Sequence, residues 1–142
     1  MVTWDVGPFD NDAASDWSAT FDEADEATRL EMLEETLTAA ADETEYLDAD
    51  TAFEAIAAAA AIAAQLGGPA IDSPYGPDFL DKPGALDVPA RLPPLAVRAL
   101  DRIVADDSEW RDQWDEQDQL DDAMATLAPI REALAAKGGS ST

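Results

Sequence analysis

At 142 residues the chain has room for one domain with a sizeable core, and it contains neither cysteine nor histidine. This composition excludes disulfides, thiolate nucleophiles, the usual zinc sites and every histidine-based catalytic triad. The chain carries 32 Asp and Glu residues against 8 Lys and Arg residues, a formal net charge of −24, so its surface repels phosphate backbones and anionic membranes.

The charge also indicates which binding partners the protein can have. We expect no direct nucleic-acid binding, no membrane binding, and a basic protein as any partner. Dense carboxylates are also typical of proteins adapted to a salt-rich cytoplasm, where screening weakens their mutual repulsion. No basic and apolar leader opens the chain, so a cytoplasmic location is expected.

The start of the chain predicts an extended lead-in followed by a short helix. Residues 1–9 contain Gly7-Pro8 and lack a helical period. Asp10 or Asn11 is placed to cap a helix that runs to about Phe21. The apolar positions of this helix recur at four-residue steps: Ala13, Trp17 and Phe21.

A second helix begins at Glu26, after a break at residues 22–25. Its apolar stripe is Ala27, Leu30, Leu33, Leu37 and Ala40 or Ala41. The opposite face carries Glu31, Glu34 and Glu35. This pattern predicts a surface helix whose stripe is turned inward.

The third predicted helix is the alanine-rich segment 51–66, TAFEAIAAAAAIAAQL, in which only Glu54 and Gln65 are strongly polar. A helix that is apolar on every face must be surrounded by other elements, so we expect it at the centre of a bundle. A membrane span needs about 20 clearly apolar residues, which alanine does not supply. Thr51 and Glu54 have the spacing of a capping box, and Gly67 marks the end.

Residues 67–92 are rich in turn-forming residues, in the runs GGP, SPYGP and KPG. They predict a long irregular loop between the third and fourth helices, and a loop of this length is either functional or poorly ordered. Several apolar residues favour packing of this loop on the bundle: Ile71, Tyr75, Phe79, Leu80, Leu86 and Val88.

The last third of the chain predicts three helices. Pro93-Pro94 starts the fourth, which reaches Ala105, with Leu95, Val97 or Arg98, Ala99, Leu100, Ile103 and Val104 in its pattern. Asp107 or Ser108 caps the fifth, and residues 117–119 interrupt its pattern. The sixth begins at Leu120. Because Pro129 removes a backbone donor, we expect a kink or a break near residues 126–128.

The chain lacks any sustained alternation of apolar and polar residues, which argues against strands. The predicted fold class is all-α: a single-domain bundle of five to six helices over residues 1–137, around a buried Ala-rich central helix. Residues 138–142 are expected to form a disordered tail.

Two clusters are candidate sites. Asp10, Asp12 and Asp16 offer oxygen ligands for a divalent cation, although their spacing matches no calcium loop and acidic residues also suit the first turn of a helix. The second cluster consists of Trp110, Trp114 and Arg111. If the tryptophans are exposed, the cluster is a candidate hot spot for a protein partner, and if they are buried, they belong to the core.

Four arginines lie in the same third of the chain: Arg91, Arg98, Arg102 and Arg111. They fit either an anion clamp or neutralisation of carboxylates on neighbouring helices. No catalytic or cofactor-binding residue is predicted.

The opening MVTWDVGPFDNDAASDW resembles the family known as domain of unknown function 4259. The resemblance rests on Trp4, Phe9, Asn11-Asp12 and the run 14–17, and it extends to ALDRIVADDSEWRDQWDE at residues 99–116. Val2 and Asp5 stand where that family has glycines, and Pro129 falls where its last helix continues. The resemblance implies a fold but no activity.

Three functions are therefore weighed. The first is a non-catalytic interaction module for a basic protein, of the immunity or antitoxin type. The second is a metal-binding protein or enzyme that uses the N-terminal carboxylates. The third is a mimic of nucleic acid, which requires acids in two rows on one face.

Overall fold

The alanine-rich segment forms helix α3 (Ala49–Gln65), and every residue from Ala55 to Ala63 is buried. The computed structural model describes residues 12–65, 91–105 and 107–139. Within these ranges α3 contacts each of the other five helices. The prediction of a central helix buried on all faces is confirmed, and its small side chains are what let so many neighbours approach it closely.

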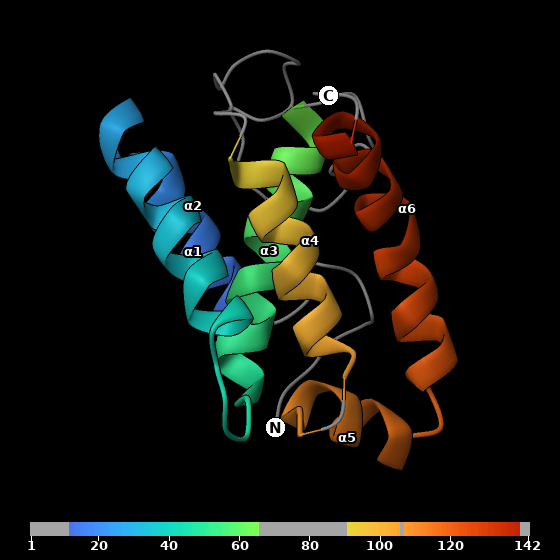
Figure 1. Cartoon of the computed structure of the whole chain (residues 1–142). Coiled ribbons are helices and arrows are strands. Elements are labelled where there is room, and N and C mark those ends of the chain that lie inside the picture. Colours follow the sequence, from blue (N-terminus) through green and yellow to red (C-terminus); the bar gives the residue numbers. More distant parts are fainter. Residues whose placement is uncertain (1–11, 66–90, 106, 140–142) are drawn as a thin grey trace.

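The surrounding helices are α1 (Asp12–Glu23), α2 (Glu26–Ala41), α4 (Leu92–Ile103), α5 (Glu109–Glu116) and α6 (Leu120–Gly139). Helix α4 lies in front of α3, with α2 on its left and α6 on its right, and the short α5 crosses the lower end of the bundle (Figure 1). The predicted all-α bundle is confirmed. None of the described helices is long and apolar enough to cross a bilayer.

The apolar stripes pack as the sequence predicts, with small differences. Trp17 and Phe21 are stacked with ring centroids 4.8 Å apart, and the Trp17 indole N–H donates to the Thr36 hydroxyl over 3.1 Å. On α2, Leu33 and Leu37 are fully buried, whereas Ala27 is exposed and does not belong to the stripe.

Helix α4 is rotated slightly from the predicted pattern. The residues it buries are Leu92, Pro93, Ala96, Ala99, Leu100 and Ile103, whereas Leu95 and Val97 are only half-buried. The two prolines stand in its first turn, where their missing N–H groups have no helical partner to lose.

Helix starts are capped by short polar side chains. Asp25 accepts the Thr28 backbone N–H over 2.8 Å, which lowers the pKa of the Asp25 carboxyl. Ser108, one of the two predicted candidates, caps α5. For α3 the predicted cap is wrong: Asp48, three residues before Thr51, accepts the backbone N–H of Thr51 over 3.2 Å and its hydroxyl over 2.6 Å.

Helix α6 continues through Pro129 from Leu120 to Gly139. Of the two predicted outcomes, a kink or a break, the break is therefore absent. Pro129 is exposed, and water satisfies the carbonyl that loses its helical donor more easily there than in a core. The helix includes two glycines of the predicted tail. The lead-in, the tail residues 140–142 and the predicted loop up to residue 90 lie outside the described residues.

Candidate functional site

The chain segments before α3 and before α5 lie side by side and are joined by backbone hydrogen bonds. The Leu47 N–H donates to the Asp107 carbonyl over 2.8 Å, and the Glu109 N–H donates to the Leu47 carbonyl over 2.8 Å. Leu47 and Ser108 form the isolated parallel bridge between these segments. We call this contact, formed by residues 43–48 with 107–109, the connector junction.

Arg102, at the end of α4, holds the connector junction with its guanidinium group. It donates to the carbonyl oxygens of Glu43 over 2.9 Å, Asp107 over 3.2 Å, and Glu45. A guanidinium presents several N–H donors in one plane, so a single side chain satisfies carbonyls from both segments. Arg102 therefore acts as a structural cross-link rather than as part of an anion clamp.

The start of α5 completes the connector junction. Ser108 is fully buried, and its hydroxyl accepts the Arg111 backbone N–H over 3.4 Å. The Glu109 carboxylate accepts the Ala49 N–H over 2.7 Å, so a side chain of α5 satisfies an end group of α3. The two helix starts are consequently fixed relative to each other.

Tyr46 lies on the outside of the connector junction. Its side chain is 53% exposed, and it is the one exposed large hydrophobic residue in the part of the chain that the structure describes. Its hydroxyl donates to the Asp112 carboxylate over 2.7 Å. This hydrogen bond raises the pKa of Tyr46 to about 12, and the nearby charges of Glu109 and Glu116 contribute to the rise.

The tryptophans of the predicted hot spot do not reach the surface. Trp110 and Trp114 are each only 3% exposed and pack in the core. The Arg111 side chain donates to the Val104 carbonyl over 2.7 Å, at the end of α4. The outer face of α5 instead carries Asp112, with Tyr46 reaching it from a position 66 residues earlier.

The remaining arginines that were candidates for an anion clamp form ion pairs between helices. Arg91 pairs with Glu34 at 2.9 Å, and Arg98 pairs with Asp42 at 2.9 Å, so both tie α4 to α2. The prediction that these two neutralise carboxylates of neighbouring helices is confirmed.

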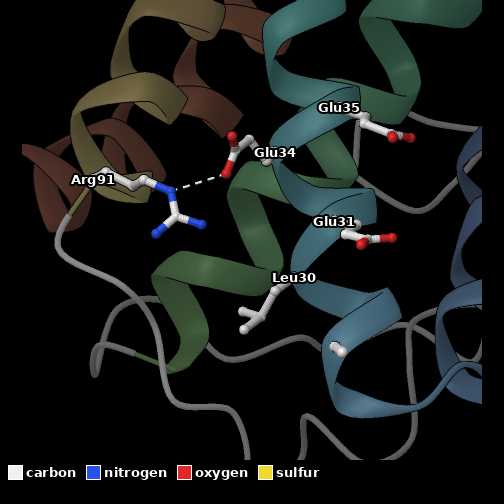
Figure 2. A pocket seen from close by; sticks show the side chains of 6 residues that line it. Leu30, Glu31, Glu34, Glu35 and Arg91 are labelled. Carbon is white, nitrogen blue, oxygen red and sulfur yellow. Dashed lines mark hydrogen bonds and ion pairs between the residues drawn. The ribbon is translucent and has the colours of Figure 1, made fainter.

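A hollow of about 460 Å³ adjoins α2 and the start of α4. Its lining is Ala27, Leu30, Glu31, Glu34, Glu35 and Arg91. Figure 2 shows Glu34 turned toward Arg91, whereas Glu31 and Glu35 point away from it. Three of the six lining residues are therefore acidic, and the single arginine is already paired with one of them.

The predicted metal site cannot be assembled from the described residues. Asp10 lies outside them, Asp12 is the first residue of α1, and Asp16 is exposed on that helix. Across the described ranges, no three Asp, Glu, His or Cys residues come together in a way that would hold a metal ion.

The fold and the connector junction define a highly charged, single-bundle helical protein. The chain belongs to the family described as Domain of unknown function (DUF4259), whose model matches residues 2–126. This match confirms the resemblance noted in the opening residues and covers α1 to α5 with the beginning of α6. Comparison with curated proteins and with solved structures found no match.

Proposed function

We propose that the protein is a non-catalytic interaction module that binds a basic partner through Tyr46 and the carboxylates around it. We call this set, Tyr46 with Asp112 and Glu116, the Tyr46 surface. The observation that carries the proposal is an exposed aromatic ring held by a hydrogen bond among negative charges. An aromatic anchor with a charged rim is typical of protein contact sites.

The connector junction supports this proposal because it makes the Tyr46 surface rigid. Arg102 and the Leu47–Ser108 bridge hold the segment that contains Tyr46 against the segment that precedes α5. A surface that is ordered before binding avoids part of the entropy cost of association. A lysine or arginine of the partner would stack on the exposed ring and meet the Asp112 and Glu116 carboxylates.

The charge balance of the whole chain points to the same class of partner. The net charge is −24. All six arginines of the sequence make contacts within the chain, either ion pairs with carboxylates or hydrogen bonds to backbone carbonyls. The surface left for a partner is thus negative and attracts basic proteins over a distance set by the salt concentration. An immunity or antitoxin role is one form that such binding takes.

Exposed carboxylates occur on every described helix, for example Asp16, Glu31, Asp50, Asp101, Asp112 and Asp121. This dispersal does not favour mimicry of nucleic acid, which needs ordered rows on one face. The metal-binding alternative stays a prediction.

The test is capture of a partner from a lysate of the cells that make the protein, at low and at high salt, by the native chain and by Asp112→Lys. We expect the native chain to retain a basic protein at low salt. Charge reversal beside Tyr46 should weaken the affinity by roughly tenfold or more, the loss typical of a contact worth at least about 1.4 kcal/mol.

Asp122→Lys is the matched control, because Asp122 is also exposed, also lies in the first turn of a helix, and gives the same change of charge. It should leave the affinity nearly unchanged. Equal losses in the two variants would show that only the overall charge matters, and the absence of any retained protein would count against the interaction module itself.

A further inference from the structure

We draw no further inference here: the strongest candidate, the acidic hollow between α2 and Arg91 at the start of α4, has its arginine already paired with Glu34, and none of the residues that line it leaves a buried polar group unpaired to indicate a ligand.

Discussion

Glu54 brings a carboxylate into the otherwise apolar helix α3, where it is half-buried. Burial raises the pKa of the Glu54 carboxyl above its usual value of 4.5, and the charges of Asp50 and Asp48 raise it further. The folded chain therefore holds this proton more tightly than the unfolded chain does. The resulting stabilisation is fully present below about pH 4.5 and is lost as the pH rises through the folded-state pKa.

Replacing Glu54 with glutamine should stabilise the protein at neutral pH, because glutamine has no charge to desolvate. We expect Glu54→Gln to raise Tm by about 1–2 °C near pH 7, a small gain since the side chain is half-exposed. The gain should vanish below about pH 4, where Glu54 is protonated in both states.

Thermal unfolding followed by circular dichroism over this pH range measures the effect. Glu35→Gln is the control, since Glu35 is exposed on α2 and its replacement relieves the same amount of net charge. A Tm difference from the control that persists unchanged at pH 3 would contradict the explanation by burial.

The Arg102 side chain donates hydrogen bonds to three backbone carbonyls that lie outside the helices. Arg102→Met leaves the carbonyls of Glu43, Glu45 and Asp107 without their guanidinium donor. Because hydrogen bonds from a charged donor contribute about 1.5–3 kcal/mol, we expect a loss of about 2–3 kcal/mol in the free energy of unfolding, measured by urea denaturation.

Arg98→Met is the matched control on the same helix. Arg98 makes an exposed ion pair with Asp42, and such pairs contribute about 0–1 kcal/mol. The two variants lose the same charge. Similar losses in the free energy of unfolding would therefore show that the Arg102 hydrogen bonds stabilise the protein no more than an exposed ion pair does.

At the scale of single elements, α3 shows what alanine does in a core. Its side chains from Ala57 to Ala59 are fully buried, and five other helices pack around the helix. A core at native density has no room for three additional carbon atoms on one of these residues without displacing a neighbouring helix.

Overpacking α3 should therefore destabilise the protein even though leucine is the more hydrophobic residue. We expect Ala59→Leu to reduce the free energy of unfolding by about 1–3 kcal/mol. Ala125→Leu, at an exposed position of α6, should change it by less than about 0.5 kcal/mol in the same urea titration. An Ala59→Leu variant as stable as the native chain would mean that α3 is loosely packed.

At the scale of the whole molecule, the dominant feature is the net charge of −24. The exposed arginines Arg91, Arg98 and Arg131 each pair with one carboxylate, but the sequence holds 32 acidic residues against 8 basic ones, so negative charge remains in large excess. Mutual repulsion of these carboxylates opposes the compact state, and salt weakens it.

Stability should therefore rise with ionic strength. Between about 0.1 M and 1 M NaCl the screening length falls from about 10 Å to about 3 Å, and we expect Tm to increase by several degrees over that range. Sucrose at equal osmolality is the control, because it leaves the charges unscreened. A Tm that stays flat in NaCl, or that rises no more than in sucrose, would show that repulsion is not limiting.

Most of the bundle is predictable from the chain itself, because the information is local. The stripe with Leu33 and Leu37, the interruption near residues 117–119 and the proline-led start of α4 all follow from periodicity and from capping. The family also follows, from the opening residues and the run 99–116.

The candidate site is different, since its parts are far apart in sequence. Tyr46 and Asp112 are separated by 66 residues, and neither belongs to a motif. Trp110 and Trp114 carry the spacing of a hot spot, yet they face the core because α6 and α3 pack against α5. Which side of a short helix becomes surface depends on its neighbours, and spacing within the helix does not encode them.

The sequence by itself determined that the protein is an acidic helical bundle around an alanine-rich helix. Charge is read directly from composition, and the helical period is a pattern among residues close together in the chain. Only the tertiary structure decided that Arg102 joins two connectors, that Asp48 rather than Thr51 caps α3, and that Tyr46 stands beside Asp112. The joining contacts are hydrogen bonds between distant segments, and they exist only once the helices have packed.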